Sequence, residues 1–192
     1  MKKETPVRPK NICLLHGWGA NVQKLTPLKK ELEKLGWKVF LPKLPFFDLP
    51  EPAAPWVLAD FAAFVNKETQ KFFKDEPYSL FGHSFGGRIA IKISSSGDKQ
   101  NLSSLVLCAT AGISRPNVIK RDFFKFLAKT SAPFRKIGLP LESTSKKIIY
   151  HLAGASDYKQ ILSRAKKETF QNVVEEDLKP VVAKITLPTL IL

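Results

Sequence analysis

The chain carries the stretch Tyr-Ser-Leu-Phe-Gly-His-Ser-Phe-Gly-Gly at residues 78–87, and this stretch decides the fold. Its first four residues read as a strand, and helical spacing of apolar residues follows at about 85–96. Between them lies Gly-x-Ser-x-Gly, the pattern of a strand that turns sharply into a helix and exposes a serine at the carboxyl edge of a sheet. Gly82 and Gly86 let the backbones approach without a β-carbon clash. We therefore predict that Ser84 is a nucleophile; the alternative is an accidental glycine-rich turn.

Short apolar strands alternate with amphipathic helices on both sides of this turn. We expect strands at 11–15, 37–41, 78–81, 105–109 and 188–192, and helices at 21–35, 55–74 and 85–96. Residues 42–55 carry five prolines and are expected to form a loop. This alternation predicts an α/β fold with a parallel sheet covered by helices on both faces.

The pattern changes after residue 112, because 113 to about 178 show only helical signals. One apolar stripe comprises Ile119, Phe123, Phe126 and Leu127, and a later helix, capped by Ser156, is expected to run through Thr169. We predict a core at 1–112, a helical insertion at 113–178 and a return to the core at 179–192. Residues 113–170 hold thirteen lysines and arginines against four acids, which indicates either a solvated helical face or a docking surface for an acidic partner, a membrane or nucleic acid.

A second candidate element, His16-Gly17-Trp18-Gly19, ends the first predicted strand. In a parallel sheet this loop and the Ser84 turn open on the same edge. The backbone N–H groups of Trp18 and Phe85 are then predicted to form an oxyanion hole. His16 is expected to orient the loop through hydrogen bonds, with Gly17 beside it, rather than to act as a base.

Two further histidines receive structural interpretations. His83 is expected to point away from Ser84 as a packed, hydrogen-bonded neighbour that shapes the site. His151 lies in the helical insertion and is expected at the surface or in a lid. Neither is predicted to be the catalytic base.

Three landmarks together resemble the α/β-hydrolase superfamily: the His16–Gly19 loop, the Ser84 turn and the stretch Pro-Thr-Leu-Ile-Leu at 188–192. The resemblance covers the chain from Asn11 onward. It implies that residues 113–178 are a helical cap, and that a serine nucleophile hydrolyses an ester, thioester, amide or carbon–carbon bond. It argues against haloalkane dehalogenases and epoxide hydrolases, which use aspartate. Lys43, where many members carry an acid, and Phe46-Phe47, where a glycine-rich turn is usual, depart from the pattern.

The family's catalytic triad runs Ser, then Asp or Glu, then His along the chain. The resemblance places the acid just after residue 192 and the histidine further on, so the triad acid and His are absent from this chain. A strand at 188–192 is expected to be buried, where a chain terminus is unfavourable. We therefore expect this sequence to be an N-terminal fragment, with an unpaired apolar edge at Leu190–Leu192.

Composition and charge narrow the class of protein further. The 192 residues have a formal net charge of +14 and 44% hydrophobic residues, and no apolar run approaches a membrane span. Cys13 and Cys108 lie in apolar runs and are expected to pack as core residues in a reducing cytoplasm. No cofactor or metal is implied, since the histidines and cysteines are scattered.

These observations predict a serine hydrolase, carboxylesterase-like, that cleaves an ester-type bond of a small or medium acyl substrate through an acyl-enzyme on Ser84. The cap stripe would line an apolar acyl pocket. The alternative is a non-catalytic binding protein of the same fold that uses the basic cap as its contact surface. Nucleic acid is not an expected partner, and oligomeric state cannot be read from the sequence.

Overall fold

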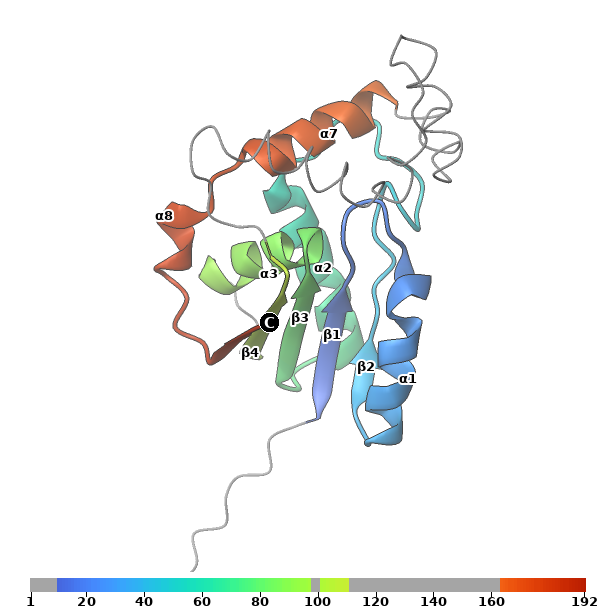
Figure 1. Ribbon diagram of the computed structural model, residues 1–192, viewed down its shortest axis with the longest axis vertical. Coiled ribbons are helices and arrows are strands. Elements are labelled where there is room, and N and C mark those ends of the chain that lie inside the picture. Colours follow the sequence, from blue (N-terminus) through green and yellow to red (C-terminus); the bar gives the residue numbers. More distant parts are fainter. Residues whose placement is uncertain (1–9, 98–100, 111–162) are drawn as a thin grey trace, which may run out of the picture.

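Five parallel strands form the centre of the computed structural model, which describes residues 10–97, 101–110 and 163–192 (Figure 1). They are β1 (Asn11–Leu15), β2 (Lys38–Phe40), β3 (Tyr78–His83), β4 (Leu102–Cys108) and β5 (Thr189–Ile191). Their order is β2-β1-β3-β4-β5, and every neighbouring pair is parallel. The predicted α/β architecture is therefore confirmed.

The strand order reverses at β1, which lies between β2 and β3. The chain leaves β1 to form β2 on one side and later returns to form β3 on the other. In open parallel sheets such a reversal opens a crevice at the carboxyl ends of the two central strands. The loop after β1 and the turn after β3 meet at this crevice.

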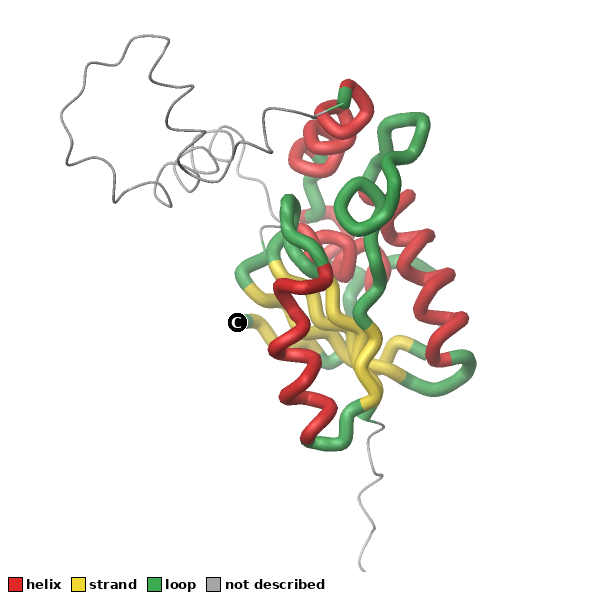
Figure 2. The backbone as a smooth tube through the Cα atoms, turned by 90° about the vertical axis from the view of Figure 1, so that its right-hand side faces the viewer, coloured by secondary structure: helices red, strands yellow, loops and turns green. Residues whose placement is uncertain are grey.

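Helices cover both faces of the sheet (Figure 2). The described helical segments are the 3₁₀ turn η1 (Val22–Leu25), α1 (Thr26–Lys34), α2 (Leu58–Phe73), α3 (Phe85–Ser95), α7 (Arg164–Glu175) and α8 (Lys179–Val182). Leu25 and Leu32 pack on one face, whereas α2 and α3 bury Phe61, Val65 and Ile89 on the other.

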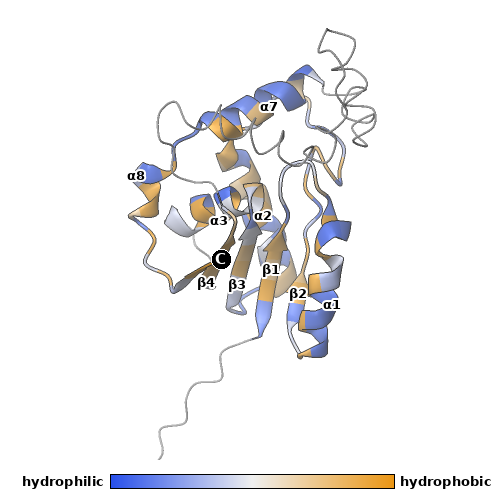
Figure 3. Ribbon diagram, viewed as in Figure 1, coloured by the Kyte–Doolittle hydropathy of each residue, from blue (hydrophilic) through white to orange (hydrophobic). Residues whose placement is uncertain are grey.

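Alternating side chains explain why β1 occupies the middle of this sandwich. Cys13 and Leu15 face the core formed with α2 and α3, and Ile12 and Leu14 face the opposite cluster. All five residues of β1 are buried, as expected for an interior parallel strand. Figure 3 shows apolar colouring along much of β1 and on parts of α2, α3 and α8, and hydrophilic colouring over much of α1 and α7.

Several predicted boundaries are wrong. β4 begins at Leu102 instead of residue 105, and the helix expected at 21–35 is divided into η1 and α1. Three further boundaries differ as follows. The helix expected from Pro55 begins at Leu58, because the Asp60 carboxylate accepts the N–H of Val57 at 2.7 Å and caps the helix there. The helix expected to be capped by Ser156 begins at Arg164, where the Ser163 hydroxyl accepts the N–H of Lys166 at 3.0 Å. The third is β3, which runs to His83 instead of ending at residue 81.

Most of the predicted helical insertion, residues 113–162, lies outside the described residues. The Ile119–Leu127 stripe, the Ser156 position and His151 belong to that part. The described remainder holds α7, and its Val173 is buried in the same core as α2 and α3, together with Leu178. The boundary at residue 178 stays a prediction.

The expectation of a buried final strand is wrong, whereas the predicted apolar edge is observed. β5 pairs with β4 and lies at the end of the sheet. Leu190, Ile191 and Leu192 are 54%, 76% and 66% exposed.

Cys13 is buried as predicted, but Cys108 is only partly buried. Within the described ranges, no helix is long and apolar enough to cross a membrane.

Candidate active site

Ser84 occupies the sharp turn between β3 and α3 with φ 50° and ψ −108°. This positive φ is unfavourable for a residue with a side chain, by about 1–3 kcal/mol. Backbone hydrogen bonds hold it: Ser84 N–H donates to the Cys108 carbonyl at 2.9 Å, and the Ser84 carbonyl accepts from Gly87 at 3.1 Å. Although Ser84 is the N-cap residue of α3, its side chain makes no capping hydrogen bond. The Ser84 hydroxyl, at the carboxyl edge of the sheet, therefore does not cap the helix.

Glycines permit the close approach that the turn requires. A β-carbon on Gly82 would lie 2.5 Å from the Gly86 carbonyl oxygen. A β-carbon on Gly86 would lie 2.4 Å from the Leu15 carbonyl oxygen, at the end of β1. Both distances are far inside van der Waals contact, so β3, α3 and β1 can meet here only without these side chains.

The loop after β1 lies against the serine. A β-carbon on Gly17 would come within 3.5 Å of the Ser84 β-carbon and 3.1 Å of the His83 ring. Trp18 follows in the chain, and its ring centroid lies 5.2 Å from that of Phe85, the first residue of α3. The first N–H groups of a helix lack intrahelical acceptors. The structure thus brings the predicted oxyanion residues, Trp18 and Phe85, to the same place as Ser84.

Both ring nitrogens of His16 face oxygen atoms, and the side chain is buried. Its Nδ1 lies 2.9 Å from the Gly17 carbonyl oxygen, and its Nε2 lies 3.0 Å from Asp48 Oδ2. These contacts agree with the predicted loop-orienting interpretation. No sequence pattern indicated Asp48, although it is the one acid in the stretch 41–50.

His83 and Lys43 contribute less to the described geometry. His83 is exposed, and its ring lies beside Gly17, 3.1 Å from the position of a β-carbon there; its predicted orientation away from Ser84 stays a prediction. Lys43 is also exposed, and the acid of the same loop that contacts His16 is Asp48. Within residues 10–97, 101–110 and 163–192, no hydrogen bond joins the Ser84 hydroxyl to a histidine. In that same part of the chain, no three His, Cys, Asp or Glu side chains gather as a metal site.

Aromatic rings surround the Trp18 side chain. Phe47 lies 5.0 Å away, Phe85 5.2 Å and Phe170 5.0 Å, between ring centroids. They come from the proline-rich loop, from α3 and from α7, respectively. The rings create an apolar environment beside the serine.

Helix α7 lies across the carboxyl ends of the strands (Figure 1) and is fixed there by polar contacts. The Thr169 hydroxyl accepts the Trp56 N–H at 2.8 Å, and the Lys166 amine donates to the Phe46 carbonyl at 2.6 Å. At its C-terminal end, the Arg88 guanidinium of α3 donates to the Glu176 carbonyl, and the Lys92 amine lies 2.6 Å from the Glu176 carboxylate. The helix that carries Ser84 therefore also anchors α7.

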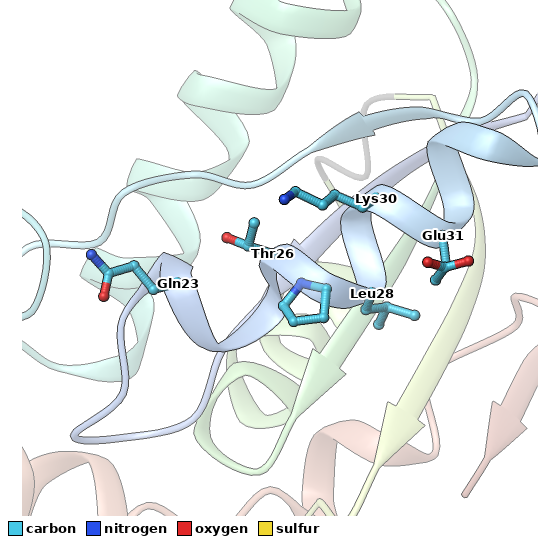
Figure 4. Close-up of a pocket in the computed structure, with 6 residues that line it drawn as sticks. Gln23, Thr26, Leu28, Lys30 and Glu31 are labelled. Atoms are coloured by element: carbon cyan, nitrogen blue, oxygen red, sulfur yellow. The ribbon is translucent and has the colours of Figure 1, made fainter.

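A separate depression lies on α1 (Figure 4) and is lined by Gln23, Thr26, Pro27, Leu28, Lys30 and Glu31. Its labelled side chains do not converge on one point. It contains none of the residues that surround Ser84. We therefore place the candidate active site at the Ser84 turn and not in this depression.

The geometry defines an α/β protein with a serine on a strand-to-helix turn, facing a loop that carries a candidate oxyanion donor. Residues 10–171 match the model of the alpha/beta hydrolase fold family. The chain belongs to this family. No curated protein matches it.

Solved structures support the same fold. An esterase from Exiguobacterium antarcticum shares 22% identity over 94% of this chain and 72% of its own, with a TM-score of 0.67. A membrane phospholipase A shares 24% over 97% and 63%, with a TM-score of 0.62. An enol-lactonase from Burkholderia xenovorans shares 18% over 98% and 74%, with a TM-score of 0.62. The chain is thus shorter than each of these proteins.

Proposed function

We propose that this protein is a serine hydrolase that cleaves an ester-type bond of a small or medium acyl substrate through an acyl-enzyme on Ser84. The observation that carries the proposal is the strained backbone of Ser84 together with a hydroxyl that does not cap its helix. Strain of this kind persists where the surrounding structure enforces it, and it concentrates at functional sites.

In the proposed reaction, Ser84 Oγ attacks the carbonyl carbon of the substrate and its proton passes to a base. The N–H groups of Trp18 and Phe85 stabilise the oxygen that becomes negatively charged, and the N-terminus of α3 adds a favourable dipole. The alcohol leaves with a proton, and water then attacks the acyl-enzyme to release the acid and restore Ser84. The base and its acid are not assigned to described residues.

The comparisons support the class of bond. The similar structures include an esterase, a phospholipase A and an enol-lactonase, all named for ester-type substrates. The rings of Trp18, Phe47 and Phe170 favour an apolar acyl group. The competing candidate is a binding protein that uses the basic surface predicted for residues 113–170.

A fluorophosphonate probe tests the assignment, because it reacts covalently with activated serines. We expect the protein expressed from its natural reading frame to be labelled, and Ser84→Ala to abolish labelling. Ser95→Ala, a serine of the same helix whose hydroxyl only bonds the Lys92 carbonyl, is the matched control and should label normally. Labelling that persists in Ser84→Ala, or a wild-type protein that never labels, would exclude the proposed nucleophile.

A further inference from the structure

The Asp48 carboxylate binds both ends of the loop that carries Trp18. Its Oδ2 lies 3.0 Å from His16 Nε2 at the start of the loop, and its Oδ1 accepts the Val22 N–H at 2.9 Å at the end. Oδ2 also accepts the Leu44 N–H at 3.1 Å, which fixes the proline-rich loop to the same point. One side chain therefore sets the position of residues 16–22.

His16 transmits this position to a single peptide plane. The Gly17 carbonyl can only accept a hydrogen bond, so His16 Nδ1 donates to it at 2.9 Å. The Gly17 carbonyl and the Trp18 N–H belong to one planar trans peptide and point in opposite directions. Fixing the carbonyl on the His16 side therefore turns the Trp18 N–H to the other side.

Burial makes these contacts hard to exchange for water. The side chains of His16 and Asp48 are only 1% and 5% exposed. A buried polar group left without a partner is unfavourable by about 1–3 kcal/mol. Phe47, the residue before Asp48, packs its ring against His16 at 5.6 Å and Trp18 at 5.0 Å and closes the pair from solvent.

We infer that Asp48 and His16 are positioning residues that hold the Trp18 N–H in place as an oxyanion donor. This inference rests on the proposed function, since it assigns a purpose to the Trp18 peptide in that reaction. Neither side chain touches the substrate: Asp48 acts through His16, and His16 acts through the Gly17 carbonyl. A proton lies between Nε2 and Oδ2, whichever of the two atoms carries it.

The first experiment measures the loop without any need for activity. In residues 1–192, NMR follows the exchange of the Ala20 amide, which donates to the Gly17 carbonyl at 3.2 Å. In Asp48→Ala we expect this amide to exchange about tenfold faster or more, and the protected ring proton signals of His16 to disappear. Asp60→Ala, which removes an aspartate that caps α2, is the matched control and should change neither. Unchanged Ala20 exchange in Asp48→Ala would overturn the inference.

The second experiment measures the consequence for reaction. In the protein expressed from its natural reading frame, the fluorophosphonate reaction is separated into kinact and KI at a temperature where all variants are folded. We expect kinact to fall about 10- to 100-fold in Asp48→Ala with KI nearly unchanged, because an oxyanion donor acts in the transition state. Asp60→Ala should keep both constants. A wild-type kinact in Asp48→Ala contradicts the inference.

Asp48→Asn keeps the size of the side chain and carries the test if Asp48→Ala does not fold. Its amide can accept from Val22 and donate to His16, but it loses the acceptor for Leu44. We therefore expect a kinact between those of wild type and Asp48→Ala; a wild-type value counts against the inference. If the wild-type protein does not label, the proposed function fails, whereas the Ala20 exchange still decides whether Asp48 holds the loop.

Discussion

Ser84 shows how neighbouring residues maintain an unfavourable backbone conformation. Its φ of 50° is held by the hydrogen bond from Ser84 N–H to Cys108 and by the first turn of α3. Gly82 and Gly86 remove the side chains that would separate β3, α3 and β1. The strain is therefore supported by packing that only glycine permits.

Gly86→Ala should destabilise the protein by about 3 kcal/mol or more, because its β-carbon would lie 2.4 Å from the Leu15 carbonyl oxygen. Gly97→Ala is the matched control, since no atom of the described residues lies within 4 Å of the added carbon. It should change stability by less than about 0.5 kcal/mol. Urea unfolding followed by circular dichroism measures both. Equal stability of the two variants would show that the close approach is not rigid.

Cys13 should resist thiol reagents in the folded protein, while Cys108 should react. Burial raises the pKa of the Cys13 thiol well above its usual range, so almost no thiolate forms, and reagents cannot reach it. Cys108 is partly exposed. A colorimetric disulfide reagent should therefore modify one thiol at first and two after denaturation, with Cys108→Ser as the control. Rapid modification of two thiols in the native state contradicts this assignment.

At the residue scale, short local motifs were enough to predict most of the candidate site. Ser84, Gly82 and Gly86 were identified because their constraint lies within five residues of sequence. Asp48 was not, because its partner His16 is 32 positions away and the path of the proline-rich loop decides the contact. His83 is exposed, and the Gly-x-Ser-x-Gly motif alone does not predict the burial of that position.

At the scale of elements, α7 is tied to the helix that carries the serine. Arg88 and Lys92 of α3 both reach Glu176, which is the C-cap of α7. Burial lowers the pKa of Arg88, and the charges of Glu176 and Asp177 oppose that shift. The charges of Glu176 and Asp177 thus offset part of the free-energy cost of burying the Arg88 guanidinium.

Arg88→Met should accelerate amide exchange in α7 while it lowers the free energy of unfolding of the whole protein only slightly. The change removes the donor to the Glu176 carbonyl but keeps an apolar side chain, so the global loss should be about 1 kcal/mol. Amide exchange within α7 should accelerate several-fold. Arg164→Met is the control, because its partner Glu168 lies on α7 itself and the arginine is exposed. Identical α7 exchange in the two variants would show that Arg88 is not an anchor.

Phe170→Ala should shift acyl preference toward longer chains. The ring fills space beside Trp18, at 5.0 Å between centroids, and α7 holds it there. Its removal leaves room for several methylene groups next to the proposed oxyanion hole. The ratio of kcat/KM for p-nitrophenyl octanoate over acetate should rise several-fold. Phe72→Ala is the control, because Phe72 is an exposed ring of α2 stacked on Phe40, and it should leave the ratio unchanged. If Phe170→Ala and Phe72→Ala give the same octanoate-to-acetate ratio, Phe170 does not line the acyl pocket.

Helix positions were predicted better than helix ends. Periodicity located α1, α2 and α3 correctly, because each must bury one face on the sheet. The starts of α2 and α7 were displaced because the caps are Asp60, inside the helix, and Ser163, one of several candidate serines. A cap depends on the local backbone, which periodicity does not reveal.

At the scale of the whole molecule, the sheet ends in an exposed apolar edge. Leu190, Ile191 and Leu192 are more than half exposed, and the outer side of β5 has no strand beside it in the described part of the chain. Unpaired apolar edge strands invite association with other chains. The chain also spans 63% to 74% of the three structures compared above.

Residues 1–192, expressed as such, should hydrolyse p-nitrophenyl acetate at a negligible rate, and Ser84→Ala should change little. Among the described residues, the buried His16 is occupied by Asp48 and the Gly17 carbonyl, so it is not free to accept the Ser84 proton. His83 has no hydrogen bond to Ser84 among the described contacts, and His151 lies outside the described residues. A serine without its base loses roughly 10⁴- to 10⁶-fold in rate.

The outcome separates two locations for the base. Turnover by residues 1–192 that disappears in Ser84→Ala would show that a base lies within this chain, and His151→Gln would then distinguish His151 from His16. A rate equal to that of Ser84→Ala, with labelling restored in the protein expressed from its natural reading frame, would place the base outside residues 1–192. The loop held by Asp48 would then serve as a preformed oxyanion hole that still lacks the group activating Ser84, since donors alone stabilise the charge but do not remove the hydroxyl proton.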